Sequence, residues 1–261
     1  MNRHNILAQL LAADHIVVFT GAGMSADSGI PTFRDGAGAL WNGIDPMSVA
    51  SLQGFEADPN KVWDWHLALK RSTEHAQPNR GHEAIAALEQ ILSQARITVI
   101  TQNIDGLHQR AGSREVIELH GTVNRIRCHD HCGYETTWNF LPESRICPDC
   151  GAQLRPDVVW FGEGLDEYSM SDAQQAAAAA DIIFVVGTSS LVQPAASIPL
   201  LAQMKGATLV EINPSETKLT SRADYSERAS ASEFFPLICE EIQEMKLRES
   251  MQPSSFDRKQ R

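Results

Sequence analysis

A short apolar run followed by a glycine-rich turn constrains the fold of this 261-residue chain more than any other feature. The run His15 to Phe19 reads HIVVF, and β-branched residues that stop at a turn predict a buried β-strand. Gly21, Gly23 and Ala26 then give the spacing G-x-G-x-x-A. The first glycine permits a tight turn, and the second lets a pyrophosphate approach the backbone where the next helix begins. The sequence therefore predicts a nucleotide-binding turn near the N-terminus.

The residues after this turn depart from an ordinary dinucleotide-binding unit. An acidic residue about 20 positions further on usually holds the adenine ribose, and it is missing here. The chain continues instead with Pro31, Phe33, Arg34 and Asp35, in a segment too irregular to be the crossover helix. We interpret this segment as an insertion whose aromatic and charged side chains serve chemistry.

The rest of the chain alternates between segments typical of helices and of strands. Apolar residues at helical spacing predict helices between residues 46 and 93. Further strands are expected at 95–103, 115–121, 182–190 and 207–214, an extended piece at 157–163, and helices at 171–181, 194–204 and 233–246. Such alternation predicts an α/β fold with a parallel, doubly wound sheet.

Four of the five cysteines fall within 23 residues, at Cys128, Cys132, Cys147 and Cys150. Two close pairs in a chain without an export signal favour zinc over disulfides, because a reducing compartment disfavours disulfides and thiolates bind zinc tetrahedrally. The second pair has the spacing C-x2-C, whereas the first, CHDHC, is C-x3-C and also offers His131. We expect one structural zinc ion on four cysteines, with three cysteines and His131 as the alternative. Four protein ligands leave no open position for catalysis.

Polar residues follow several of the expected strands, where ligands collect in a doubly wound sheet. They are Gln102, Asn103, Asp105, His120, Ser189, Ser190 and Asn213. Amides and hydroxyls suit hydrogen bonds to ribose and phosphate, while Asp105 and His120 suit proton handling or positioning. Any one of them alone is better explained as a cap or turn residue. Their recurrence after successive strands favours a ligand site.

The overall charge and the N-terminus narrow the choice of partners and compartment. The formal net charge of −11 argues against a nucleic-acid-binding surface and suits basic partners such as lysine-rich peptides. No apolar run approaches the roughly 18 residues of a membrane span, and the N-terminus lacks the apolar core of a signal peptide. We expect a cytoplasmic monomer that binds neither membranes nor nucleic acid.

The chain resembles the sirtuin family of NAD-dependent protein-lysine deacylases. The matching motifs are GAGMSADSGIPTFR, TQNIDGLH, ELHG, the two cysteine pairs, RPDVVWFGE, GTSSLVQPA and INP. They follow the family's order along most of the chain. Together they are far more specific than a lone glycine motif.

The resemblance implies a large Rossmann-type domain and a small lobe made of a helical insertion and a zinc module. We assign residues 1–35, 95–127 and 155–247 to the NAD-binding domain, 36–94 to the cofactor loop and helical insertion, and 128–154 to the zinc module. Residues 248–261 are expected to be a disordered tail. NAD and acyl-lysine would meet in the cleft between the two parts.

The resemblance also implies roles for residues that match the motifs. Phe33 and Arg34 would close over the reacting end of NAD, as part of a mobile loop that accounts for the irregular insertion. His120 would be the catalytic base, while Asn103 and Asp105 would position the ribose and nicotinamide. The other cofactor contacts are assigned to Gly21, Ala22, Gly23, Gln102, Gly187, Thr188, Ser189, Asn213, Pro214, Ser215 and Ala231.

The reaction implied by the resemblance begins with loss of nicotinamide, which leaves an oxocarbenium-like ribose. The amide oxygen of the substrate captures the ribose as an O-alkylimidate. His120, with an ordinary pKa of about 6.5, would then take a proton from the ribose hydroxyls. Water completes the release of lysine and 2′-O-acyl-ADP-ribose, and zinc takes no part.

The stretch from Val158 to Gly162 is expected to pair with the substrate backbone as a β-strand, so that main-chain bonds dominate recognition. Val158, Trp160, Phe161 and Gly162 are the expected substrate contacts. Core packing is a plausible alternative for one of the two aromatic residues.

Two helical positions bear on the acyl group. Sirtuins that prefer succinyl or malonyl groups carry a Tyr and an Arg three residues apart, and the Arg can pair with the acyl carboxylate. His66 and Leu69 stand at these positions and complete the expected substrate-binding set, with simple packing as the alternative role for both. Lys70 or Arg71 could replace the Arg only with a register slip, which turns the charge by about 100 to 200° around the helix. We therefore expect acetyl or another uncharged acyl group.

Two other functions would use the same residues. A mono-ADP-ribosyltransferase or NAD glycohydrolase would consume NAD without needing acyl-lysine. A non-catalytic interaction module would bind NAD as a sensing ligand. The second is disfavoured because a pure binder has no evident need for Asn103, Asp105 and His120 together.

Overall fold

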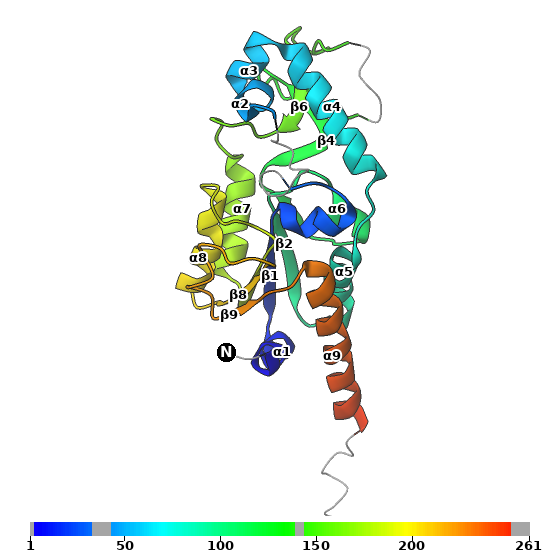
Figure 1. The fold of residues 1–261 in the computed structure, drawn as a ribbon, viewed down its shortest axis with the longest axis vertical. Coiled ribbons are helices and arrows are strands. Elements are labelled where there is room, and N and C mark those ends of the chain that lie inside the picture. Colours follow the sequence, from blue (N-terminus) through cyan, green and yellow to red (C-terminus); the bar gives the residue numbers. More distant parts are fainter. Residues whose placement is uncertain (1–2, 33–42, 139–143, 252–261) are drawn as a thin grey trace, which may run out of the picture.

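The computed structural model describes residues 3–32, 43–138 and 144–251, and within these ranges its centre is a six-stranded parallel sheet (Figure 1). The spatial order is β3-β2-β1-β7-β8-β9. The strands are β1 (His15–Thr20), β2 (Arg96–Thr101), β3 (Val116–Glu118), β7 (Ile182–Val186), β8 (Thr208–Ile212) and β9 (Tyr225–Glu227). Counted along the chain this order is 3-2-1-4-5-6, that of a Rossmann fold. The predicted doubly wound parallel sheet is confirmed.

Helices cover both faces of this sheet (Figure 1). The helices on one face are α1 (Arg3–Ala12), α5 (Arg80–Ile91) and α9 (Ala231–Met251), and those on the other are α7 (Glu167–Ala178) and α8 (Ile198–Met204). Successive strand residues face opposite sides, so Ile16 and Val18 join the first core while Val17 and Phe19 join the second. Burial on both faces explains why this strand is a continuous apolar run.

A smaller unit lies beyond the carboxyl edge of the large sheet, at the top of Figure 1. Its antiparallel strands have the order β5-β4-β6 and are β4 (Gly121–Cys128), β5 (Glu135–Thr137) and β6 (Leu154–Val158). The helices α2 (Pro46–Val49), α3 (Leu52–Ala57) and α4 (Pro59–His75) accompany it. Phe55, Trp63 and Trp160 are buried in the core that they share.

The division of the chain between the two units differs in part from the sequence-based assignment. Residues 121–127 and 155–158 were counted with the NAD-binding domain, yet they pair with each other in the small sheet. The expected strand 115–121 is interrupted, because β3 ends at Glu118 and the small sheet begins at Gly121. Gly121 has a φ of +73°, and a Cβ there would lie 2.1 Å from the Asp157 carbonyl oxygen. This close approach is what separates the two strands.

Several short elements had no clear signal in the sequence. These are α1, β9, the small-sheet strands and α6 (Leu107–Ala111). The residues after β1 form a 3-10 helix, η1 (Ala22–Ser28). Helix α9 runs to Met251, so the expectation of a disordered tail is wrong for residues 248–251. None of the helices in the described ranges has the length and apolar character that a membrane crossing requires.

Two glycine turns bring the ends of β1 and β7 into backbone contact. The Gly21 N–H donates to the Val186 carbonyl (3.0 Å), and the Gly23 N–H donates to the Gly187 carbonyl (2.8 Å). Gly187 has a φ of +58°, and a Cβ there would lie 2.4 Å from the Met24 nitrogen. Only glycine fits such an approach, because the left-handed conformation and the missing space both exclude a side chain.

We expect Gly187→Ala to lower the free energy of unfolding by about 3 kcal/mol or more, since backbone strain and a backbone clash coincide. Urea denaturation measures this loss. The matched control is Gly29→Ala, where φ is +81° but no atom lies within 4 Å of the added Cβ. That change should cost only about 1 to 2 kcal/mol. Equal losses in the two variants would contradict the role given to the contact.

Candidate functional site

Strand register places the predicted site residues at one edge of the large sheet. Thr20 lies level with Thr101 and Val186, and Val186 lies level with Ile212. The chain therefore leaves four neighbouring strands at the same height, at residues 21, 102, 187 and 213. The sheet order reverses between β1 and β7, which is the point where α/β sheets bind ligands.

A buried polar group centred on Ser25 lies directly beneath this edge. The Asn103 amide donates to the Gly21 carbonyl (3.0 Å) and to Ser25 Oγ (3.1 Å). Ser25 Oγ in turn donates to an Asp105 carboxylate oxygen (2.7 Å), and the Leu107 N–H donates to the other (2.9 Å). Burial raises the pKa of Asp105, while its hydrogen bonds from Leu107 and Ser25 oppose that rise. The group holds Asn103 and Asp105 in fixed orientations.

Ser25 was absent from the residues predicted for the site. It is 1 % exposed and connects the turn after β1 to the loop after β2. A hydroxyl two positions after the second glycine of the turn was the available signal. That signal was weak, because a serine at the start of a helix commonly serves as a cap.

Side chains also connect the loops that follow β2, β7 and β8. The Gln102 amide donates to Thr188 Oγ1 (3.1 Å), and the Asn213 amide donates to the Thr188 carbonyl (3.0 Å). Thr188 is thus held from both sides. The three loops form one connected rim along the sheet edge.

His120 lies at the same edge, two residues after β3. Its Nδ1 is 3.0 Å from the Gln102 carbonyl oxygen, so Nδ1 carries the proton and Nε2 is left as an acceptor in the neutral ring. Burial lowers the pKa of His120, and the hydrogen bond to Gln102 partly offsets this effect. A neutral imidazole with a fixed tautomer suits a general base.

A small cleft opens between the two units. Its walls come from the segment after β1, from helix α4 and from the loop after β2, and they include Ala22, Ser25, Ile30, Leu69, Asn103 and Asp105. Asn103 and Asp105 supply polar atoms to an otherwise largely apolar lining. The cleft therefore combines an apolar lining with a few polar groups, as small-molecule sites do.

The stretch expected to bind substrate divides into a buried and an exposed part. Val158 and Trp160 are buried, whereas Phe161 is 40 % exposed and Gly162 is exposed. Trp160 packs 5.1 Å from the ring of Phe55 and donates its indole N–H to His66 (3.2 Å). Of the two aromatic residues, Trp160 is thus the core residue.

The two positions expected to read the acyl group lie in different surroundings. His66 is fully buried, with one ring nitrogen 2.9 Å from the Val62 carbonyl oxygen and the other accepting from Trp160. Burial lowers the pKa of His66 to about 4, so the ring is neutral. Its side chain offers a substrate no free polar atom. Leu69 lines the cleft beside Asn103 and Asp105.

Neither neighbouring cation takes the place of the missing arginine. The Lys70 ammonium lies 2.9 Å from the Glu74 carboxylate and 3.3 Å from the Asn124 amide oxygen, and its side chain is only 6 % exposed. Arg71 is exposed on α4. The cleft lining includes neither residue.

The remaining predicted cofactor residues occupy varied positions. Ser189, Pro214 and Ser215 are exposed on the loops that follow β7 and β8. Ala231 begins helix α9 and is buried against Gly81 of α5. Phe33 and Arg34 lie outside the described residues.

The four clustered cysteines come together in the small unit. Their sulfur atoms all lie within 4.8 Å of one another, and the Cys128–Cys150 and Cys132–Cys147 sulfurs are 3.5 Å apart. A tetrahedron with Zn–S bonds of about 2.3 Å has edges of about 3.8 Å. The arrangement therefore fits one zinc ion on four cysteines, as predicted.

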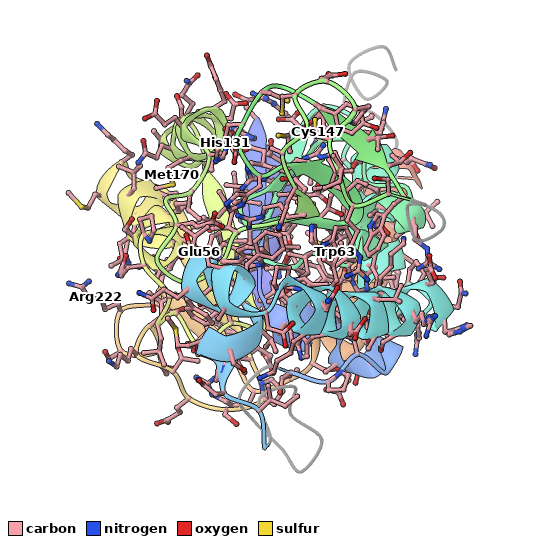
Figure 2. All side chains as sticks on the ribbon, turned by 90° about the horizontal axis from the view of Figure 1, so that it is seen from above. Glu56, Trp63, His131, Cys147, Met170 and Arg222 are labelled. Atoms are coloured by element: carbon pink, nitrogen blue, oxygen red, sulfur yellow. The ribbon has the colours of Figure 1, made fainter. Side chains whose placement is uncertain are left out.

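The alternative ligand His131 takes no part in this group. Its Nδ1 lies 3.0 Å from a guanidinium nitrogen of Arg127. His131 and Cys147 lie on the same side of the molecule when it is seen from above (Figure 2). Among the described residues, the metal-ligating group consists of the cysteines alone.

Comparison with known proteins places these features in one family. The family model described as "Sir2 family" matches residues 21–194. An NAD-dependent protein deacylase of Methylococcus capsulatus is 43% identical over 249 residues, which cover 91% of this chain and 96% of the relative. NAD-dependent protein deacylase 1 of Archaeoglobus fulgidus is 45% identical, covering 87% of this chain and 93% of the relative.

Solved structures of Sir2 proteins are also similar to this chain. A Sir2 homologue in complex with ADP-ribose superposes with a TM-score of 0.88 at 42% identity, covering 95% of this chain and 98% of the other. A complex of a Sir2 homologue with NAD superposes with a TM-score of 0.86 at 42% identity, covering 94% of this chain and 95% of the other. A Sir2 protein bound to a deacetylated p53 peptide and 3′-O-acetyl ADP-ribose superposes with a TM-score of 0.82 at 32% identity, covering 92% of this chain and 98% of the other.

We expect Cys147→Ser to lose the zinc ion and to lower the melting temperature by roughly 5–10 °C, because metal binding and folding are coupled. Elemental analysis of the purified variant and a thermal melt measure the two effects. Cys239→Ser is the matched control, since Cys239 is buried outside the cluster. One equivalent of zinc and an unchanged melt in Cys147→Ser would contradict the assignment.

Proposed function

Because the chain belongs to the Sir2 family, we infer that it is an NAD-dependent protein-lysine deacylase that releases nicotinamide, free lysine and 2′-O-acyl-ADP-ribose. The observation that carries this inference is His120 at the edge of a Rossmann-type sheet, hydrogen-bonded to Gln102 in the same loop that carries Asn103 and Asp105 into the cleft. This is the edge at which such sheets bind dinucleotides.

NAD fits this edge as the co-substrate. The turn of Gly21, Ala22 and Gly23, beside Gly187 and Thr188, is assigned to the pyrophosphate because it opens the 3-10 helix η1. The Gly21 and Gly23 N–H groups already donate to Val186 and Gly187, so the Ala22 backbone is the part proposed to meet the ligand. The adenosine end is assigned to the exposed loops, at Ser189, Asn213, Pro214 and Ser215, with Ala231 at the start of α9. The nicotinamide end is assigned to the cleft, with Gln102 beside it and Phe33 and Arg34 closing over the reacting end.

Asn103, Asp105 and His120 would carry the reaction. The fixed amide of Asn103 and the carboxylate of Asp105 would position nicotinamide and its ribose while the glycosidic bond breaks. His120 Nε2 would then accept a proton from a ribose hydroxyl, while its Nδ1–H stays on the Gln102 carbonyl. Zinc fits a structural role, because four cysteines fill its coordination sphere.

The acyl-lysine substrate would pair with the exposed end of the stretch from Val158 to Gly162. The N–H groups of Val159 and Phe161 already donate to the carbonyls of His120 (3.0 Å) and Ala50 (2.8 Å). Among the described residues, the Val159 carbonyl and the Gly162 N–H have no such partner. These two groups remain for a substrate backbone or amide.

We further propose that the acyl group is acetyl or another uncharged group. His66 is neutral and enclosed, Leu69 is apolar, and Lys70 is already paired with Glu74. A buried carboxylate without a cation would be costly. An uncharged acyl group avoids that cost.

The setting of the enzyme is also a proposal. We propose a monomer in the cytoplasm that binds no nucleic acid, which rests on the net charge of −11 and on clustered cysteines suited to zinc in a reducing compartment. The domain ranges stay as assigned from the sequence, except that 121–127 and 155–158 are better grouped with the zinc module.

We expect His120→Ala to reduce deacylation by about 10²- to 10⁴-fold, because the general base is lost, while zinc content and melting temperature stay unchanged. In the native enzyme, the acid limb of kcat/KM should have its midpoint below pH 6.5. Burial lowers the pKa of His120, so its neutral, active form persists to lower pH. Near-normal turnover by the variant would remove His120 from the mechanism.

The function itself is tested by mass spectrometry with purified protein, NAD and matched acetyl-lysine and succinyl-lysine peptides. We expect NAD-dependent loss of acetyl with formation of O-acetyl-ADP-ribose, and at least about tenfold slower loss of succinyl. Loss of succinyl that is faster than loss of acetyl would show that another cation binds the succinyl carboxylate. Nicotinamide release without either peptide would favour an NAD glycohydrolase, and NAD binding without turnover a sensing module.

A further inference from the structure

We infer that the buried ion pair between Arg155 and Glu163 positions the substrate-binding stretch, and that it controls affinity for the acyl-peptide without controlling affinity for NAD. This inference rests on the proposed function, because it assigns peptide binding to residues 158–162. Both side chains lie outside the cleft that Asn103 and Asp105 line and outside the glycine turns. They are positioning residues, since they act through the backbone between them.

The pair encloses the stretch from both ends. Arg155 lies in strand β6. Its guanidinium donates two hydrogen bonds to the Glu163 carboxylate, at 2.5 and 2.9 Å. The same guanidinium donates to the Val158 carbonyl (2.8 Å), and the same carboxylate accepts from the Trp160 N–H (2.8 Å). One ion pair therefore fixes two backbone groups of the stretch between its partners.

The surroundings of Arg155 explain why an ion pair is needed at this point. Its side chain is 0 % exposed, and Glu163 is 11 % exposed. The guanidinium carbon lies 3.3 Å from the centre of the Trp160 ring, so the planar group stacks on the indole. A buried guanidinium without its carboxylate would be strongly unfavourable, so removing either partner must rearrange the backbone that both hold.

Trp160 extends this arrangement to helix α4. Its indole N–H donates to His66, whose other ring nitrogen lies on the Val62 carbonyl of the same helix. The stretch is thus fastened to the small sheet through Arg155 and to α4 through Trp160. Strand β6 ends at Val158 and the chain turns at Gly162, where φ is +88° and the Glu163 N–H donates to the Trp160 carbonyl (3.0 Å), so only part of the expected extended piece 157–163 is a strand. A peptide would meet a stretch whose backbone is already fixed, with little conformational entropy left to lose on binding.

Steady-state kinetics of Glu163→Gln test the inference. Glutamine keeps an oxygen for the Trp160 N–H but removes the charge opposite Arg155. We expect KM for the acetyl-peptide to rise about tenfold or more while KM for NAD stays within about twofold. A rise in both, or in neither, would overturn the inference. Failure of the unmodified enzyme to deacylate would instead overturn the proposed function.

Arg125→Gln is the matched control. Arg125 pairs with Asp157 at 2.6 Å in the same small sheet, but its side chain is 39 % exposed and, within the described part of the chain, donates no hydrogen bond to residues 158–162. Both KM values should stay unchanged in this variant. An equal rise in peptide KM would show that any loss of charge from the sheet has this effect, and would overturn the assignment to Arg155 and Glu163.

Hydrogen exchange on the unmodified protein supplies a readout that does not depend on a variant folding. The Trp160 amide should be protected from exchange before any peptide is added, because Glu163 already accepts its hydrogen bond. The Gly162 amide should gain protection only when acetyl-peptide binds. Rapid exchange of the Trp160 amide in the peptide-free protein would overturn the inference even if neither variant could be purified.

Discussion

The contact between two glycine turns is the interaction on which the rest of the site depends. The turn after β1 and the turn after β7 are joined by backbone hydrogen bonds, with the Gly23 N–H donating to the Gly187 carbonyl. This contact fixes the spacing between β1 and β7, the neighbouring strands at which the strand order of the sheet reverses. Ser25 and Thr188, which organise the polar groups on either side, both take their positions from these turns.

The parts of the fold that the sequence predicts well are those governed by a single local rule. Strand β1 is buried on both faces, so its apolar run was unambiguous. The cysteines were equally clear, because four thiols in two pairs have few alternatives to a metal. The edge of the sheet followed from strand order, since parallel strands present their carboxyl ends together.

The parts that the sequence did not predict depend on contacts between distant segments. The three residues of β9 are too few to show a pattern, and their pairing depends on β8 beside them. The small sheet was hidden because Gly121 and Asp157 meet only in the folded chain. His66 was read as an acyl contact, and its actual surroundings depend on Trp160, which lies 94 residues away. Arg155 and Glu163 stood in a recognised motif, but their pairing is visible only in three dimensions.

His120 is one of the two residues between β3 of the large sheet and β4 of the small sheet, and it is hydrogen-bonded toward both units. Its ring is hydrogen-bonded to the carbonyl of Gln102, in the loop directly after β2 of the large sheet. Its own carbonyl accepts the N–H of Val159, in the stretch expected to bind the peptide. His120, the proposed base, therefore contacts both units. Any rotation of one unit against the other must stretch one of these two bonds. With peptide binding and base catalysis assigned as proposed, the two hydrogen bonds of His120 couple alignment of the peptide to alignment of the imidazole.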